Sequence, residues 1–414
     1  MVDPTLTAAG GPAITGRPGR RPVAMLTHSY YEEDPRVRRE AESLVAAGRP
    51  VDVFSLRRPG DEPEGMLDGV RVRRLDVQRH QGASLAVYLR EYLDFFVRAA
   101  WSLVRAHVRR RYALIQVHTL PDFLAFAALP LRATGVPVLL DLHEAMPEFF
   151  RSRFPRAANP LVHRALLLQE RLSIGAASHA ITVNDALGKR LVRLGVPAAK
   201  VSIVINSPSL ARFDPLRYPR RGFAWDGTVR LVYAGALTPT YELDVAIDAV
   251  ARILDRRPEL PVAFEVYGRG DSEAGLRAQV ERLDLGKRVT FHGRIPLEDV
   301  PAAIAAADIG LAPTRQDKFT DASLSTKIFE YGAMGRPAVA SRLPLVERTF
   351  PPGTVATYRA GDPDGLATAI LRLVDDPGAR EAAVARMAKR VRELAWEREA
   401  ERYVALVDRL AGSR

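Results

Sequence analysis

The 414-residue chain contains no cysteine and no long apolar run. Without cysteine it can form neither a disulfide framework nor a thiolate metal site, a composition that fits a reducing compartment such as the cytoplasm. A transmembrane helix needs about eighteen or more consecutive apolar residues, and no such stretch occurs. Residues 1–22 lack the continuous apolar core of a signal peptide, and we expect them to form a disordered leader.

Acidic residues are outnumbered: 60 Lys and Arg stand against 49 Asp and Glu, for a formal net charge of +11. Arginine dominates the basic residues, but no compact basic motif is interleaved with aromatic residues, so we do not expect nucleic acid as a partner. Hydrophobic residues make up 47% of the chain, as in globular proteins. The length favours two domains over a single core.

Short apolar runs alternate with amphipathic segments along the whole chain. This alternation predicts parallel strands joined by crossover helices, and hence doubly wound α/β sheets. The predicted strands are 23–26, 51–56, 70–75, 114–118, 136–142, 179–183 and 201–205, followed by 229–234, 262–267, 289–292, 309–312, 337–340 and 354–358. The predicted fold class is α/β, with two tandem Rossmann-like domains facing a cleft that would hold a ligand.

The segment between the two series of strands is rich in Pro, Arg and Gly and lacks an apolar period, which is typical of a linker. We therefore expect an N-terminal domain over 23–206, a linker over 207–227 and a C-terminal domain over 228–394. The helix expected over 396–411 should pack back on the N-terminal domain. The helix expected over Leu85–Arg111 mixes aromatic residues with arginines. We favour packing on the first sheet, and the alternative is contact with an anionic membrane surface.

The stretch 314–340 predicts a loop, a helix with a tight stop, and a buried strand late in the second series. Ser323 or Ser325 is a candidate N-cap, because a hydroxyl there can accept a hydrogen bond from a free backbone N–H. Lys327 and Glu330 are three residues apart and share one helix face. A helix start, a cation and a carboxylate at one loop suit a phosphate that carries a sugar. An ordinary surface ion pair is the alternative.

Other candidates follow predicted strands. Gly268 follows strand 262–267, and a glycine there permits either a tight turn or close approach of the backbone to a ligand. His118 ends strand 114–118, and His143 with Glu144 forms a competing pair. The candidates for binding an acceptor are Asp34, Arg36, Arg39, Asp122, His143 and Glu144. We find no Asp-x-Asp motif with an evident metal role and no His/Asp cluster, so the sequence predicts no metal.

Several stretches carry a family resemblance. In the second half they are AGALTPTYELDVAIDAV, VYGRGDSEAGLRAQVERLDLGKRVTFHGRIPLEDVPAAIAAADIGLAP and STKIFEYGAMGRPAVAS. In the first half they are VHTLPDFLAF, DLHEAMPEFF and ITVNDALGKRLVRLGVPAAKVSIVINS. In order and spacing, the chain from about Val23 to Leu410 resembles the GT-B, retaining, family-4 glycosyltransferases that use nucleotide sugars.

The resemblance implies transfer of a sugar from a UDP- or GDP-sugar to a glycan, lipid-linked or small-molecule acceptor. It implies no cofactor besides that substrate, a role in cell-envelope polysaccharide biosynthesis, and a place in the cytoplasm or at the inner face of the membrane. Glu330 matches a carboxylate that binds ribose hydroxyls, His118 a histidine that faces the sugar, and Lys327 is the third catalytic candidate. The implied donor-binding residues are Gly235, Gly268, Arg294, Arg315, Ser325, Thr326, Lys327 and Glu330.

The chain departs from the family where two basic residues commonly hold the donor diphosphate. Ala236 stands in the place of an arginine, and Tyr241 stands in the place of a lysine. We expect Lys327, Arg315, Arg294 or the helix start to meet that charge instead. Two alternatives remain at this point: a non-catalytic GT-B subunit or binding protein that has lost the diphosphate clamp, and another nucleotide-sugar enzyme such as a 2-epimerase.

Overall fold

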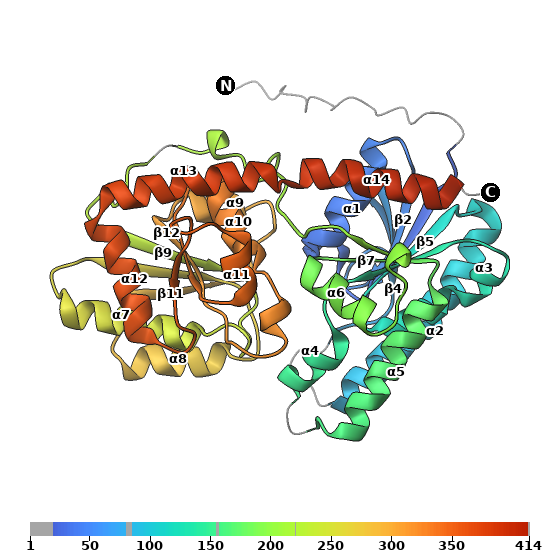
Figure 1. The fold of residues 1–414 in the computed structure, drawn as a ribbon, viewed down its shortest axis with the longest axis horizontal. Coiled ribbons are helices and arrows are strands. Elements are labelled where there is room, and N and C mark those ends of the chain that lie inside the picture. The colour runs from blue at the N-terminus through green and yellow to red at the C-terminus, as the bar shows by residue number, and fades with distance from the viewer. Residues whose placement is uncertain (1–19, 80–84, 155–156, 220, 413–414) are drawn as a thin grey trace, which may run out of the picture.

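The computed structural model describes residues 20–79, 85–154, 157–219 and 221–412. Over these residues the chain forms two α/β halves side by side, each built on its own sheet (Figure 1). The first sheet has eight strands in the order β3-β4-β2-β1-β5-β6-β7-β8, and the second has six in the order β11-β10-β9-β12-β13-β14. The predicted class, two tandem Rossmann-like units, is therefore confirmed.

The first sheet is parallel except at one edge. Its strands are β1 (Val23–Leu26), β2 (Val51–Leu56), β3 (Glu64–Leu67), β4 (Val70–Leu75), β5 (Leu114–His118), β6 (Val138–Leu142), β7 (His179–Thr182) and β8 (Val201–Ile203). Only β3 runs antiparallel, to β4, among the described strands. The sequence analysis missed β3 because its side chains are exposed or half-buried, so it carries no apolar run.

The second sheet is parallel throughout the described strands. Its strands are β9 (Val229–Ala234), β10 (Val262–Tyr267), β11 (Val289–Gly293), β12 (Ile309–Ala312), β13 (Ala338–Ser341) and β14 (Ala356–Tyr358). Every strand predicted for the two sheets is present, and predicted and observed ends differ by at most two residues, as at Val138 in place of Val136.

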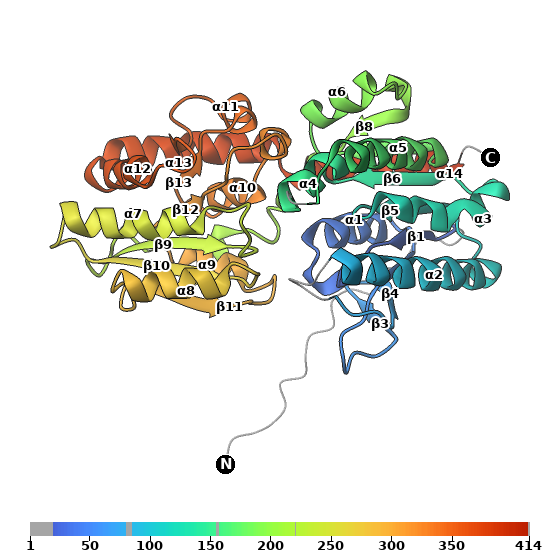
Figure 2. The ribbon, with the colours of Figure 1, turned by 90° about the horizontal axis from the view of Figure 1, so that it is seen from below.

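Helices cover both sheets (Figure 2). In the first half they are α1 (Pro35–Ala46), α2 (Leu85–Arg110), α3 (Leu129–Ala133), α4 (Met146–Arg153), α5 (Pro160–Ala176) and α6 (Asp185–Arg193), with the 3-10 helices η1 (Tyr31–Glu33), η2 (Asp122–Ala128) and η3 (Ala198–Lys200). The linker carries η4 (Pro215–Arg217). The second half has α7 (Leu243–Arg256), α8 (Glu273–Arg282), α9 (Val300–Ala305), α10 (Thr326–Ala333), α11 (Pro344–Thr349), α12 (Pro363–Asp375) and α13 (Pro377–Glu393), with η5 (Thr320–Ala322).

The last helix, α14 (Trp396–Gly412), lies across the first half, in line with α13, which lies across the second (Figure 1). Tyr403 of α14 is fully buried, and its hydroxyl donates to Gln116 Oε1 at 2.6 Å. Trp396 Nε1 donates to Ser43 Oγ at 2.9 Å. Successive residues of β1 serve two cores: Leu26 packs with α2, and Met25 packs with α1 and α14.

Of the expected leader, residues 1–19 lie outside the described residues. Arg20 is described, and its guanidinium lies 3.1 Å from Asp408 of α14. The carbonyl oxygen of Pro22 accepts a hydrogen bond from the backbone N–H of Ala113. The chain that enters β1 is therefore held against the first half from Arg20 onward.

Helix α10, the helix predicted within 314–340, is seated on β12 through a tyrosine and a glycine. The Tyr331 hydroxyl donates to the carbonyl oxygen of Leu311 at 2.9 Å. A Cβ atom on Gly310 would lie only 2.2 Å from the Tyr331 ring. Gly335, with φ of 68°, then ends the helix as predicted. This close packing fixes the start of α10 relative to the strand ends.

The substitution Gly310→Ala should therefore destabilise the second half. Overpacking a tight core costs about 1–3 kcal/mol, and the midpoint of denaturant unfolding measures it. Gly275→Ala is the matched control, because a Cβ there in α8 meets nothing within 4 Å. We expect that control to gain up to about 1 kcal/mol from helix propensity. An unchanged midpoint for Gly310→Ala would contradict the packing described.

Candidate active site

A cleft of about 1320 Å³ lies between the two halves. The segments that follow β1, β6, β9, β10 and β12 contribute to its lining. Ligands bind outside the carboxyl ends of parallel strands in open α/β sheets, because the loops there converge and backbone N–H groups are free. This cleft is therefore the candidate site, and most residues singled out in the sequence line it.

The floor of the cleft in the second half is made of two glycine loops. Gly268 has φ of 144°, and a Cβ there would lie 1.8 Å from the carbonyl oxygen of Gly235. A Cβ on Gly270 would lie 2.1 Å from the carbonyl oxygen of Leu237. The loops after β9 and β10 thus pack backbone against backbone, which agrees with the tight turn left open for Gly268. Close approach of the Gly268 backbone to a ligand stays a prediction. Gly235 and Gly268 both line the cleft.

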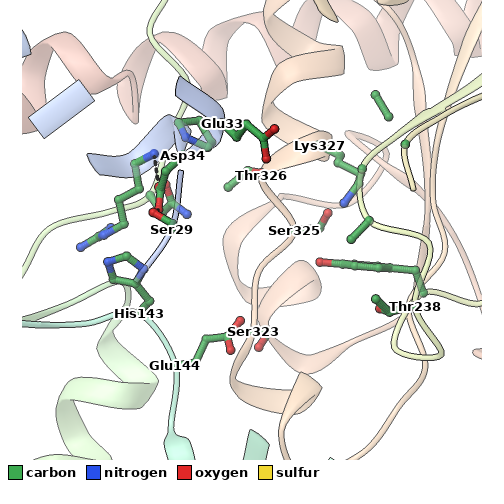
Figure 3. A pocket seen from close by; sticks show the side chains of 18 of the residues that line it. Ser29, Glu33, Asp34, His143, Glu144, Thr238, Ser323, Ser325, Thr326 and Lys327 are labelled. Carbon is green, nitrogen blue, oxygen red and sulfur yellow. Dashed lines mark hydrogen bonds between the residues drawn. The ribbon is translucent and has the colours of Figure 1, made fainter. Parts of the chain in front are cut away.

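The start of α10 faces this floor. Ser325 is the N-cap residue, but its hydroxyl makes no cap hydrogen bond. The predicted N-cap position is confirmed, and the predicted hydrogen bond is not formed. The Ser325 Oγ atom is buried and has no hydrogen-bond partner among the described residues. Ser325, Thr326 and Lys327 follow one another along the cleft wall (Figure 3).

Lys327 is 8% exposed and forms no salt bridge with any described residue, so the surface-pair alternative is wrong. Its Nζ atom lies 4.1 Å from the centre of the Tyr241 ring and 5.0 Å from that of Tyr233. A Cβ on Gly235 would lie 2.8 Å from the same nitrogen. The cation therefore reaches from α10 to the glycine loop and lies next to Tyr241.

Glu330 lies one turn along α10 and also lines the cleft. Burial raises the pKa of its carboxyl, and the charges of Lys327 and Arg39 oppose that effect. Arg294 lines the cleft and forms an ion pair with Glu33 of the first half.

Arg315 is not among the described residues that line the cleft. It lies just after Thr314, where the chain leaves β12, and its Nη2 atom donates to Ser152 at 2.9 Å and to Asp317 at 3.1 Å. Asp317 is itself fixed, because it accepts hydrogen bonds from the backbone N–H groups of Phe319 and Thr320, so the Arg315 guanidinium is engaged by the protein. The expectation that Arg315 faces the donor is therefore wrong.

On the opposite wall His143 and Glu144 face the cleft (Figure 3). His118 is 1% exposed and lies behind His143, so it does not face a sugar as expected. Asp122 is fully buried, neither carboxylate oxygen has a hydrogen-bond partner among the described residues, and burial raises its pKa well above the usual range. It begins η2 beneath α5, away from the cleft lining, so its predicted contact with an acceptor is wrong.

The three candidates around α1 line the cleft but are engaged by the protein. Asp34 caps the helix and accepts hydrogen bonds from the backbone N–H groups of Arg36 and Val37. Arg36 forms a buried pair with Asp141, and Arg39 donates to Asn206 Oδ1. Their side chains shape this wall, and Arg39 also contributes positive charge near Glu330.

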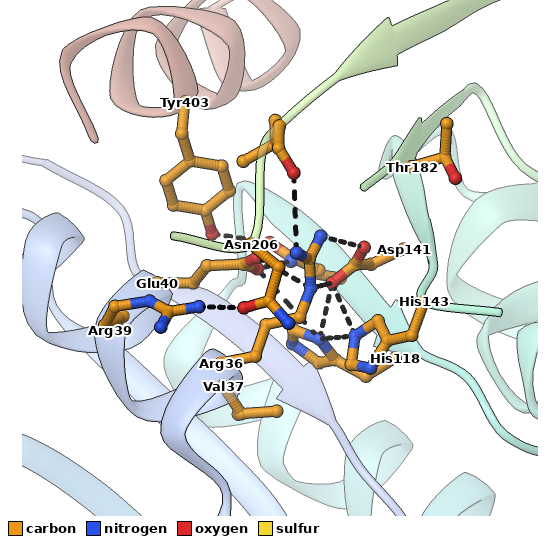
Figure 4. A network of polar contacts seen from close by, with 12 residues as sticks. Arg36, Val37, Arg39, Glu40, His118, Asp141, His143, Thr182, Asn206 and Tyr403 are labelled. Carbon is orange, nitrogen blue, oxygen red and sulfur yellow. Dashed lines mark hydrogen bonds and ion pairs between the residues drawn. The ribbon is translucent and has the colours of Figure 1, made fainter. Parts of the chain in front are cut away.

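A cluster that the sequence analysis missed lies behind this wall (Figure 4). Oδ2 of Asp141 lies 3.0 Å from His118 Nδ1 and 2.8 Å from His143 Nε2. The expectation of no His/Asp cluster is therefore wrong. Residues 118 and 141 are direct partners in the register of β5 and β6, so a register argument on the predicted strands could have found the pair.

Three such side chains could offer ligand atoms to a metal ion. The Asp141 carboxylate, however, already holds Arg36, with Nε at 2.8 Å and Nη2 at 2.5 Å. A divalent ion at this carboxylate would stand close to a buried guanidinium, and the repulsion between two cations is large in a buried, low-dielectric site. The donor set fits a hydrogen-bond network better than a metal site.

A family model for a glycosyl transferase 4-like domain matches residues 34–207, and one for group 1 glycosyl transferases matches residues 228–376. D-inositol 3-phosphate glycosyltransferase 2 of Catenulispora acidiphila is 30% identical over 351 residues, covering 81% of this chain and 79% of that protein. The chain belongs to the group 1 glycosyltransferases. This glycosyltransferase transfers a sugar from a nucleotide-sugar donor.

Further relatives of this glycosyltransferase include D-inositol 3-phosphate glycosyltransferase of Pseudarthrobacter chlorophenolicus, 25% identical over 91% of this chain and 90% of that protein. Among solved structures, sucrose-phosphate synthase from Thermosynechococcus elongatus superposes with a TM-score of 0.76 at 20% identity, over 95% of this chain and all of that one. Anabaena HepE in complex with UDP and glucose gives 0.69 at 16% identity, over 94% of this chain and 100% of that one. The glycosyltransferase thus has the GT-B fold.

Glu144 offers a test of the cleft's electrostatics. Burial raises the pKa of this carboxyl from 4.5 to about 7. Below about pH 4.5 the Glu144 carboxyl is neutral in both the folded and the unfolded chain, and its burial carries no charge penalty. As the pH rises through about 7, ionisation of the buried carboxyl lowers the stability of the folded state. Glu144→Gln should therefore match the parent near pH 4.5 and exceed its stability at pH 8, by about 1–2 kcal/mol after a discount for partial exposure.

Thermal unfolding at the two pH values measures this difference. Glu148→Gln is the matched control, because Glu148 follows closely in the chain but pairs with Arg190 at 2.8 Å. That control should lose stability or stay unchanged at pH 8. If Glu144→Gln gained nothing at pH 8, Glu144 would titrate as an ordinary carboxyl.

Proposed function

We propose that this enzyme is a retaining, metal-independent hexosyltransferase with a UDP- or GDP-sugar as donor. The observation that carries the proposal is the position of Lys327: its Nζ lies beside Gly235 and Tyr241, at the start of α10. A leaving nucleoside diphosphate gains charge in the transition state, and a fixed cation with free backbone N–H groups lowers that barrier. UDP and glucose in HepE, which shares the fold, agree with this donor class.

The second half, 228–394, would bind the donor. In this proposal Glu330 accepts hydrogen bonds from the ribose hydroxyls, and Arg294 lies towards the base. The backbone at Gly235, Gly268, Ser325 and Thr326 lies along the diphosphate. The buried, unpartnered hydroxyl of Ser325 has a donor proton free for a phosphate oxygen.

The first half, 23–206, would bind the acceptor. His143 and Glu144 face the cleft across from Ser323 (Figure 3). Transfer with retention breaks the bond between the anomeric carbon and the phosphate oxygen and forms the new bond on the same face. The acceptor hydroxyl then lies next to the leaving oxygen, which takes its proton, so no protein base is required for the balance of the reaction.

Lys327→Met removes the proposed clamp with little change in side-chain volume. We expect single-turnover transfer at saturating donor to fall at least about tenfold, equivalent to about 1.4 kcal/mol of barrier, across a panel of UDP- and GDP-sugars. Arg315→Met is the control, because Arg315 is not among the described residues lining the cleft, and its rate should stay within about twofold. Binding of a nucleotide sugar by the parent without any turnover would instead favour a non-catalytic subunit.

We further propose that the acceptor is lipid-linked and that the enzyme docks on an anionic bilayer. Leu93, Val97 and Trp101 form an exposed stripe along α2, each more than half exposed. Arg98 lies between Val97 and Trp101, and Arg90 and Arg105 flank the stripe. Within the described range Leu85–Arg110 the one exposed acidic residue is Asp94, which pairs with Arg98 at 2.7 Å. Exposed apolar side chains interleaved with arginines suit a surface of anionic lipid headgroups.

A second helix extends this surface. Helix α5 packs on η2, as α2 does, and its Leu161, Leu168 and Leu172 are also more than half exposed. Near its start α2 presents Tyr88 and Tyr92 to the cleft. One helix thus connects the cleft with the apolar stripe, which supports an acceptor with a polar end in the cleft and an apolar tail outside. No helix among the described residues has the length and hydropathy to cross a membrane.

Vesicle sedimentation tests this docking. The parent should bind vesicles rich in phosphatidylglycerol and not those of phosphatidylcholine, and binding should fall with salt. A Val97→Glu, Trp101→Glu variant should lose binding at least about tenfold. Leu216→Glu is the control, since Leu216 is 74% exposed in η4, outside the stripe. If the double variant bound the vesicles as well as Leu216→Glu does, the docking surface would be refuted. If the parent were a dimer and the double variant a monomer, the stripe would be an interface between two copies of the chain instead.

A further inference from the structure

The buried carboxylate of Asp141 contacts two imidazoles and one guanidinium. Of these side chains Arg36 and His143 line the cleft, and His143 is the more exposed. His143 has 20% of its side chain exposed there, whereas His118, Arg36 and Asp141 are all buried. Asp141 Oδ2 lies 2.8 Å from His143 Nε2. His143 is therefore the point at which this network meets a ligand.

The contacts of Asp141 decide which nitrogen of His143 carries the proton. An ionised carboxylate only accepts hydrogen bonds, and Asp141 is ionised. Burial alone would raise its pKa, but the charge of Arg36 and the hydrogen bonds from His118 and His143 hold that pKa well below the usual range. His143 must then donate from Nε2. Its Nδ1 atom keeps a lone pair and has no hydrogen-bond partner among the described residues.

Several groups face His143 and set its charge. Asp141 of β6 attracts a proton, whereas Arg36 of α1 and His118 of β5 repel one, and Glu40 of α1 and Glu144 of the cleft wall lie nearby. Burial comes first among these effects, and the pKa of His143 is lowered. For His118, burial opposes the raised pKa that its hydrogen bond to Asp141 and the charge of Glu40 produce. The two imidazoles on one carboxylate thus differ: His118 holds a proton more readily, and His143 stays neutral.

We propose that Asp141 is a positioning residue that fixes His143 in the Nε2–H tautomer, so that Nδ1 accepts a hydrogen bond from the incoming acceptor hydroxyl. This rests on the proposed function, in which the first half binds the acceptor. Before transfer, donation from that hydroxyl aims its oxygen lone pairs towards the anomeric carbon. As the new bond forms, the same proton leaves this hydrogen bond for the leaving phosphate oxygen, so His143 orients the acceptor and removes no proton. The sequence predicts no role for Asp141, because its contacts with His118 of β5 and Arg36 of α1 form only when these separate elements come together in the fold.

The tautomer can be read without any activity. Nitrogen-15 spectra of the full chain labelled at its eight histidines, with His143→Asn used for assignment, should show His143 protonated at Nε2 and not at Nδ1 at pH 7.5. In Asp141→Asn the side-chain amide can donate to Nε2, and the resonance should shift to the Nδ1–H form. A His143 protonated at Nδ1 in the parent would overturn the proposal, and this spectrum needs no variant of Asp141 that folds.

Glu40→Gln is the matched control for damage to the network, because Glu40 contacts Arg36 at 3.2 Å and has no hydrogen bond to His143 among the described contacts. It should leave the tautomer of His143 unchanged. A shift as large as that of Asp141→Asn would show that general damage, and not Asp141, changes the imidazole, which also overturns the proposal.

A double-mutant cycle gives the kinetic readout, with UDP-glucose as donor and water as acceptor. Asp141→Asn should lower kcat at least about tenfold and change the donor KM less than about twofold. In the parent, kcat should fall at acidic pH as His143 takes up a proton at Nδ1 and can no longer accept. In His143→Asn the Oδ1 atom can accept instead and does not titrate, so this fall of kcat at acidic pH should vanish.

When Asp141→Asn is added to His143→Asn, kcat should fall by less than a further factor of about two. A further tenfold loss would show that Asp141 does not act through His143. Absence of turnover in the parent would count against the proposed function, and the tautomer would still decide the inference.

Discussion

The buried ion pair between Arg36 and Asp141 is the interaction on which the first half of the site depends. It joins α1 to the end of β6, and it places a negative charge under His118 and His143 without exposing that charge to the cleft. Removing either partner would leave an uncompensated charge in the interior, at a cost of about 3–5 kcal/mol. A hydrophobic replacement could match the stability of the pair, but it could not orient an imidazole.

The second half solves a different electrostatic problem. The loop after β9 carries Ala236 and Tyr241 at the two positions where the family resemblance leads us to expect basic side chains. The cation near that loop comes instead from helix α10, through Lys327. The tyrosine in place of the lysine remains useful, because the Tyr241 ring lies 4.1 Å from the ammonium group. An ammonium over a ring face is stabilised by about 0.5–2 kcal/mol. At this point of the cleft the helix α10 therefore supplies the positive charge, and the loop after β9 supplies an aromatic ring.

The strands, the class of fold and the loop that begins α10 could be predicted from the sequence, because each depends on local apolar period and turn residues. Strand β3 could not, since its pairing with β4 leaves its side chains exposed. The side chains of Arg315 and Asp122 were placed wrongly because a strand end fixes a position but not the direction of a side chain. The ring of contacts around Asp141 depends on the register of two strands and on a helix a hundred residues away.

The return of α14 to the first half makes that half discontinuous in sequence. The backbone N–H of Trp396 donates to the carbonyl oxygen of Pro208, so the outgoing and returning segments touch where they cross. The core beneath β1 contains Tyr403 and Val407 from the end of the chain. During synthesis on the ribosome, the first half therefore cannot complete its core until α14 has been made. All strands of the second sheet emerge before α14, so the second half can complete its sheet earlier.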